Sequence, residues 1–366
     1  MKSSVLHRYV LRELLSPFLS ATAVLLSLFY AMVLVRGVEF LLGSAAQVSD
    51  WLMLGMAMLP MLLPQVLPIS LLLGVMIGFA RLGEDGELTA LASVGVSARD
   101  LARPALVLAC GVCVLLAVTV FFWKPWGIAQ MRQTAREVIE RNVLSDLKPG
   151  TVRADLPGIV FHADAVSPGP TWKRVMLIDE RDPARVSVLS APIAEATFEQ
   201  GVGMRFSNGV LVQRASAEEY STTAFEQGTL LLNVADALNR RNTFRFGHEE
   251  LSPSDLLEAA RGAEATGAPA APFWSAFHFR LSQLLAPLAL ALLATAVAQG
   301  GRKRATRTAA LIAMGVYLGF YVFSRVGVQL GERGVLPPWA AGHFPVVVAF
   351  MLGVFMLLRV ERQGAR

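Results

Sequence analysis

A polar segment between two long apolar runs, residues 81–100, holds the side chains best placed for chemistry in this sequence. Glu84 and Asp85 open a predicted short helix, where acidic groups favour the positive end of the helix dipole. Leu88 and Leu91 fall on one face of that helix. The pattern predicts a helix over about residues 84–95 that lies on a membrane surface. The alternative is a solvated turn that only joins two membrane spans.

The rest of the sequence lacks the motifs of common enzymes. It has no phosphate-binding loop, no zinc-protease or serine-hydrolase motif, and no cluster of Cys and His with metal-ligand spacing. Cys110 and Cys113 stand alone in an apolar run, so we interpret them as packing residues. We therefore expect no enzyme of a standard class, and neither a metal nor another cofactor in this chain.

The apolar runs contain almost no acidic residues near their centres, so the sequence does not indicate an ion relay. If the protein moves a substrate uphill, the energy must then come from a partner. An external motor would act through a cytoplasmic contact. The segment that contains Glu87 is the leading candidate for that contact.

The composition is that of an integral membrane protein. Of its 366 residues, 54% are hydrophobic and 17% are charged, whereas soluble domains carry about 25% charged residues. The net charge of +5 is ordinary for a bacterial inner-membrane protein, so no nucleic-acid partner is implied. Six runs are long enough to cross a hydrocarbon core of about 30 Å. They cover residues 14–35, 51–80, 101–123, 275–298, 308–330 and 337–358.

The topology of these spans follows from their flanking charges. Lys and Arg gather on one side of the membrane when both termini are cytoplasmic. This places residues 81–100 in the cytoplasm and the segment between the third and fourth spans outside it. Arg325, inside the fifth span near its outer end, is costly to bury without a partner unless its side chain snorkels to the interface.

Local signals predict the shape and the ends of several helices. Pro60, Pro64 and Pro68 recur every four residues in the second span, which predicts a kinked or broken helix. Residues 97–100 have the spacing of a capping box for the third span. Ser252 followed by a proline predicts the start of a short amphipathic helix.

The hydrophobic period drops to two between about residues 130 and 250, which predicts short strands. They cover residues 158–165, 172–179, 184–198, 204–206 with 210–212, and 229–234. Asn208 and Gly209 give a hairpin signal, since both residues accept the positive φ of a type I′ turn. With no helical pattern between the strands, an antiparallel sandwich or jelly roll is favoured.

Together these patterns predict an α+β membrane protein with six transmembrane helices, three on each side of an inserted extracytoplasmic antiparallel β domain of jelly-roll-like form. Residues 1–135 would hold the first three spans and the surface helix, and residues 136–250 the periplasmic β domain. Residues 251–272 would form a short helix and linker, and residues 273–366 the last three spans.

Three stretches of the sequence form motifs. They are Arg8-Tyr9-x-x-Arg12-Glu13, Leu67-Pro68-x-Ser70-Leu71-x-x-Gly74, and Glu87-Leu-Thr-x-x-x-Ala92-Ser-x-Gly95. Together with the order of three spans, a β domain and three spans, they resemble the LptF/LptG family of lipopolysaccharide export permeases over essentially the whole chain. The first two stretches are more similar to LptF than to LptG.

The resemblance implies one permease half of an ATP-binding-cassette exporter in the inner membrane of a Gram-negative bacterium. Its partners would be a homologous LptG-like permease, a cytoplasmic LptB-like ATPase dimer that binds the ATP, and a single-span periplasmic LptC-like protein. The substrate would be lipopolysaccharide, extracted from the outer leaflet and passed through the β domain to a periplasmic bridge. Glu87 matches the acidic residue of the family's coupling helix. The predicted ATPase contacts are Glu84, Glu87, Leu88 and Leu91.

Four basic residues are the predicted contacts for lipopolysaccharide phosphates, since they lie near the extracytoplasmic boundary and Arg–phosphate pairs are strong and selective. They are Arg36, Lys124, Arg132 and Arg136. Arg36 matches a basic residue of the family's first span, whereas Val33 replaces a second one. In the alternative, Arg36 pairs with Glu39, and the two later arginines pair with Glu137 and Glu140 on a solvated helix.

Two other classes of function remain open from the sequence. One is a non-transporting scaffold or signalling protein with a periplasmic β domain, and the other is an ion-coupled lipid carrier. A co-purifying ATPase whose activity depends on this chain would separate the exporter from both. Transport driven by a proton gradient without ATP would favour the carrier.

Overall fold

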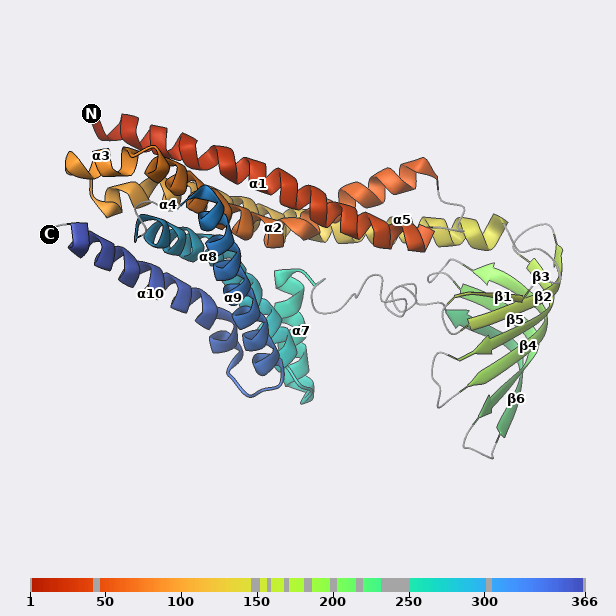
Figure 1. Cartoon of the computed structure of the whole chain (residues 1–366). Helices are drawn as coiled ribbons and strands as arrows, with labels where there is room; N and C mark the ends of the chain where they lie inside the picture. The colour runs from red at the N-terminus through yellow and green to blue at the C-terminus, as the bar shows by residue number, and fades with distance from the viewer. Residues whose placement is uncertain are drawn as a thin grey trace. The chain divides into compact units, whose positions relative to one another are not determined.

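The computed structural model describes ten stretches of the chain (Figure 1). They are residues 2–41, 47–145, 152–156, 159–167, 171–180, 186–197, 203–214, 220–231, 251–300 and 305–364. The chain divides into two compact units. The first comprises residues 1–33, 57–128 and 247–366, and the second comprises residues 34–56 and 129–246.

Six helices among the described residues are long and apolar enough to cross a membrane, which confirms the six predicted spans. Three precede the strands and three follow them. The first group and its connections comprise α1 (Lys2–Leu41), α2 (Val48–Glu84), α3 (Glu87–Ser93), α4 (Ala98–Val118), the π-helical turn η1 (Thr119–Trp123) and α5 (Lys124–Ser145). The second comprises α7 (Pro253–Thr266), α8 (Ala271–Gly300), α9 (Thr306–Glu332) and α10 (Pro338–Gly364).

Both predicted helix caps are present. Ser97 Oγ accepts a hydrogen bond from the Asp100 backbone N–H at 3.1 Å, at the start of α4. Ser252 and Asp255 form a full capping box at the start of α7, with Pro253 as the first helical residue. These bonds satisfy N–H groups that the first turn of a helix leaves without a backbone partner.

The proline-rich span α2 is one continuous helix, which excludes the broken form of the predicted kinked or broken helix, while the kink stays a prediction. Pro60, Pro64 and Pro68 all lie inside it. Each proline removes one backbone hydrogen bond, but α2 is the most buried of the six candidate spans. Packing from several neighbouring helices therefore holds the helical path through the three prolines.

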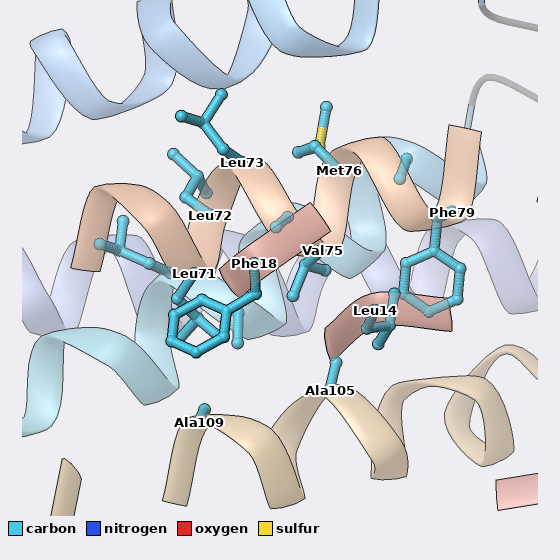
Figure 2. Close-up of a cluster of buried hydrophobic side chains, with 14 of the residues drawn as sticks. Leu14, Phe18, Leu71, Leu72, Leu73, Val75, Met76, Phe79, Ala105 and Ala109 are labelled. Atoms are coloured by element: carbon cyan, nitrogen blue, oxygen red, sulfur yellow. The ribbon is translucent and has the colours of Figure 1, made fainter. Parts of the chain in front are cut away.

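The helical core gathers around α2. Figure 2 shows Leu71, Val75 and Phe79 of α2 beside Leu14 and Phe18 of α1, with two small side chains of α4 below them. All of these side chains belong to one buried apolar cluster. Close contact between α1 and α2 at this point keeps water away from the cluster and contributes much of the packing of the first unit.

Gly74 explains why one motif residue of the second span is a glycine. A Cβ built on Gly74 would lie 2.6 Å from the Cα of Phe18, closer than such atoms approach in real structures. The absence of a side chain thus lets the backbones of α1 and α2 approach one another, as small residues commonly do between membrane helices.

The second unit contains a six-stranded antiparallel sheet whose strands follow one another in sequence order, side by side (Figure 1). The strands are β1 (Val152–Leu156), β2 (Ile159–Ser167), β3 (Thr171–Asp179), β4 (Ser187–Thr197), β5 (Gly203–Arg214) and β6 (Tyr220–Leu231). This confirms an α+β membrane protein with an inserted antiparallel β domain. The described strands form a meander in a single sheet, in place of the two sheets of the predicted sandwich or jelly roll.

The predicted hairpin at Asn208-Gly209 is wrong, because both residues lie inside the continuous strand β5. Asn208 does adopt the positive φ that the pattern indicated, at 53°. Pairs on either side, Ser190 with Val210 and Ile193 with Ser207, keep one register through this point. The asparagine therefore makes a local left-handed distortion within the strand, which its short polar side chain tolerates.

Candidate functional site

The polar segment between α2 and α4 begins differently from the prediction. Helix α2 continues to Glu84, residues Asp85 and Gly86 form a turn, and the short helix α3 starts only at Glu87. Gly86 has a φ of 77°, a left-handed conformation that glycine adopts without steric cost. Glu84 is thus the last residue of a span, and the prediction that it opens the short helix is wrong.

Glu87 is held by a tyrosine from the first helix. The hydroxyl of Tyr9 lies 2.9 Å from Oε1 and 2.7 Å from Oε2 of Glu87, so it donates to the carboxylate. Hydrogen bonds to an ionised acceptor are stronger than those between neutral groups. One turn further along α1, Glu13 lies 3.7 Å from Arg81 of α2. The N-terminal motif therefore contacts both sides of the Asp85–Gly86 turn.

Glu84 is bound to the start of another helix. The backbone N–H and the hydroxyl of Thr306 donate to its two carboxylate oxygens, at 2.9 and 2.6 Å. The residue before α9, Ala305, has no side chain that can cap the helix. A carboxylate supplied from α2 therefore caps the positive end of α9. Sequence reasoning missed this contact and that of Tyr9, although Tyr9 lies in a motif that it singled out.

Leu88 and Leu91 are half-buried and pack against the main apolar cluster of the helices. They fasten α3 to the rest of the first unit. The exposed residues around α3 include Thr89, Ala90 and Val94, the last being 75% exposed. These residues form the exposed face of α3, and contact of Glu84, Glu87 and the two leucines with a partner stays a prediction.

The four predicted phosphate contacts lie on α1 and α5. Arg36 stands in α1, and Arg132 and Arg136 stand in α5; their side chains lie outside the described part of the structure, as does that of Glu39. Lys124 begins α5 directly after the π-helical turn and is half-buried. Such turns often occur at functional sites. The roles of the four residues remain predictions.

Two arginines inside the candidate spans contact other groups of the first unit. The Arg325 guanidinium lies 5.5 Å from the ring centre of Tyr321 and 5.9 Å from that of Phe279, and its Nε donates to the Tyr321 hydroxyl at 3.2 Å. Aromatic faces attract such cations. The buried side chain of Arg280 donates to the carbonyl of Leu251, just before α7. Sequence reasoning flagged only Arg325.

A small cavity of about 40 Å³ lies beside Arg325. Gln65, Ser282 and Tyr317 contribute to its lining, and the Tyr317 hydroxyl donates to the carbonyl of Gln65 at 3.2 Å. The cavity has room for ordered water but is too small for a lipid headgroup. Among the described residues, no group of three His, Cys, Asp or Glu side chains could hold a metal ion.

The sheet has one apolar face. Trp172 and Phe206 are almost completely buried there, together with Phe161, while His162 and Arg205 are more exposed. The apolar cluster runs across β2, β3, β4 and β5, so it forms one continuous apolar face of the sheet.

The apolar face continues across a break in the usual alternation. One row of residues, running across the sheet from β2 to β6, is left out of the strand pairing. On both sides of this row the strands pair in the same register. The exposed residues of this row are Asp164, Arg174, Pro192, Asn208 and Glu226. In β3, the buried Trp172 and Val175 flank two exposed residues, so the inward parity changes at the row. A prediction from strict alternation along a strand would therefore assign the buried face wrongly on one side of this row.

Six apolar helices, a short surface helix and an inserted sheet with an apolar face define a polytopic membrane protein with an inserted β domain. Residues 8–359 match the family described as lipopolysaccharide export system permease LptF/LptG, and the chain belongs to that family. The lipopolysaccharide export system permease protein LptF of Escherichia coli strain K12 is 23% identical, with 99% of this chain and 98% of that protein covered. The LptF proteins of Escherichia coli O157:H7 and Shigella flexneri show the same identity and coverage.

Family membership makes the chain a lipopolysaccharide export permease, a transporter subunit rather than an enzyme. With its six candidate spans, it is a multi-pass inner-membrane protein that resembles LptF. This removes the non-transporting scaffold as an alternative.

Proposed function

We propose that this chain is the LptF-like half of an ATP-binding-cassette exporter that extracts lipopolysaccharide from the outer leaflet of the inner membrane and passes it to a periplasmic bridge. A homologous LptG-like permease completes the transmembrane part. An LptB-like ATPase dimer binds and hydrolyses ATP on the cytoplasmic side, so this chain needs no cofactor of its own. A single-span LptC-like protein joins the assembly, and both termini lie in the cytoplasm of a Gram-negative cell.

The observation that carries the proposal is the arrangement of α3. This seven-residue helix stands between two long spans, packs through Leu88 and Leu91, and exposes its other face. Its first residue, Glu87, is bonded to α1 through Tyr9. A short helix that is exposed on one face and bound to the other helices on its opposite face is suited to contact a cytoplasmic ATPase and to transmit its movement.

The substrate path in this proposal has a polar and an apolar part. The basic residues Arg36, Lys124, Arg132 and Arg136 bind phosphates near the outer boundary of the membrane. The apolar face of the sheet, with Phe161 and Phe206 at its centre, receives the acyl chains as the lipid leaves the bilayer. Burial of acyl chains against such a surface is favourable because it removes apolar area from water.

The proposal is tested by reversing the charge of Glu87. Glu87→Lys should still insert in the membrane but recruit at least about ten-fold less ATPase and lose transport, because the substitution reverses the charge at the proposed contact. Co-purification from membranes and lipopolysaccharide release from proteoliposomes measure both effects. Glu258→Lys, at an exposed position of α7, is the matched control. Normal recruitment and transport in Glu87→Lys would refute the coupling role.

A further arm separates the exporter from an ion-coupled carrier. Proteoliposomes without ATP but with an imposed proton gradient should release no lipopolysaccharide. Release under these conditions would identify the carrier instead.

A further inference from the structure

Two of the six candidate spans, α1 and α9, are the least buried in the chain. Both expose rows of large apolar side chains. On α1 these include Leu19, Val24 and Leu28, and on α9 they include Leu311, Leu318 and Val322. Spans with a largely exposed surface depend on a limited set of internal contacts, so those contacts determine how the spans move with the rest of the unit.

Both helices are bonded to the same turn. Tyr9 of α1 donates to Glu87, and Thr306 of α9 donates to Glu84, so the two acceptors flank Asp85 and Gly86. The partners are 78 and 222 residues apart in sequence. One compact turn before α3 thus joins two spans that expose most of their surface.

The geometry of both contacts favours transmission of movement. The donor–acceptor distances at both carboxylates lie between 2.6 and 2.9 Å, and hydrogen bonds to a carboxylate are stronger than those between neutral groups. Thr306 is the first residue of α9, so a displacement of Glu84 acts directly on the end of that helix. Tyr9 lies near the start of α1, and the Glu13–Arg81 pair one turn away guides the same helix against α2.

We propose that Tyr9 and Thr306 are positioning residues that carry a displacement of α3 to α1 and α9, respectively. When a motor moves α3, the hydrogen bonds of these hydroxyls move the cytoplasmic ends of α1 and α9 with it. The role of α3 as the input rests on the proposed function. The two hydroxyls are the output contacts, and neither needs to touch the ATPase.

Transport assays on the full complex test the consequence for coupling. Tyr9→Phe and Thr306→Val each remove one hydroxyl, and in proteoliposomes that contain lipopolysaccharide they should lower the lipid exported per ATP about five-fold or more. ATPase recruitment should stay unchanged. Tyr30→Phe on α1 and Thr308→Val on α9 are matched controls with the same chemical change elsewhere on each helix. Thr306→Ser, which keeps the hydroxyl, should restore the ratio.

Distances between spin labels test the linkage without any ATPase. In full-length chain with Cys110→Ala and Cys113→Ala, one label goes on α3 as Ala92→Cys and the other on α1 as Leu19→Cys or on α9 as Leu311→Cys. Tyr9→Phe should broaden only the distances to α1, and Thr306→Val only those to α9. Glu84→Ala, which removes both bonds from Thr306, should broaden the distances to α9 further.

These experiments distinguish the role of Tyr9 and Thr306 from the proposed role of α3 as the ATPase contact. Distances and export ratios like those of the controls would overturn the transmission role. Loss of ATPase recruitment in Tyr9→Phe, as in Glu87→Lys, would also overturn it, because Tyr9 would then only present Glu87 to the motor. Selective broadening in a chain that binds no ATPase would support the linkage while refuting the proposed function of α3.

Discussion

Asp164 on β2 and Arg174 on β3 form an ion pair across the sheet, with Oδ2 and Nε 2.6 Å apart. Arg174 has a positive φ of 50°, and both residues belong to the transverse row where the inward parity changes. The Arg174 guanidinium, and then the hydrogen bond with His162, hold the pKa of Asp164 below its usual range. The pair therefore links the titration of a carboxylate to the stability of the sheet.

The first prediction concerns pH. Because the folded state lowers the pKa of Asp164, its contribution to stability should be complete above the ordinary aspartate pKa of about 3.9 and should fall as the pH drops through the lowered value. Hydrogen exchange of β2 and β3 in the full chain should show faster opening in Asp164→Asn than in wild type at pH 7. The difference should shrink below about pH 4. A difference that grows on acidification would contradict this sign.

A second prediction concerns Asn208. Asn208→Val should destabilise the sheet by about 1–2 kcal/mol, because a β-branched residue resists the left-handed conformation, whereas Asn208→Gly should be nearly neutral. Hydrogen exchange in β5, recorded as the full chain is unfolded with denaturant, measures the stability of both variants. Thr222→Val, at an exposed position of β6, supplies the control. Equal loss in the valine and glycine variants would show that the side chain, rather than the backbone, matters there.

The position of the apolar face of the sheet predicts which residues contact lipopolysaccharide. A photo-crosslinking residue at Phe161 or Phe206 should capture lipopolysaccharide in an ATP-dependent manner, because both lie on the buried apolar face. The same residue at His162 or Arg205 should capture little. Mass spectrometry of the crosslinked chain provides the measurement. Equal labelling at all four positions would argue against a conduit along the apolar face.

Arg36 is predicted to contact an anionic headgroup at the lateral gate. Arg36→Glu should reduce lipid-stimulated ATP hydrolysis and lipid crosslinking, while Arg36→Lys should retain part of both, because a point charge survives without the bidentate geometry. Val33 leaves the region with one basic residue fewer than the family often has, so some of the effect can fall on Lys124. Intact lipid stimulation in Arg36→Glu, together with a lower folded yield of Glu39→Ala, would favour the intrahelical pair instead.

The sequence by itself determined the elements whose signals are local. Apolar length predicted six spans, and the spacing of Ser97 with Asp100 and of Ser252 with Asp255 predicted two caps that the structure contains. Period-two alternation predicted β2, β3, β4 and two parts of β5, but it missed β1 and all except the end of β6. These features depend on residues a few positions apart, so they can be inferred without knowing the fold.

The tertiary structure alone decided which distant groups meet. The bonds of Tyr9 with Glu87 and of Thr306 with Glu84 join residues that no local pattern connects. The place of Asn208 inside a strand depends on neighbouring strands that pair through it, and these override a turn signal of two residues. Likewise, three prolines remain within one helix because packing around α2 outweighs their local cost. Long-range packing and pairing energies exceed local propensities at these sites, and a single sequence does not show which segments will supply them.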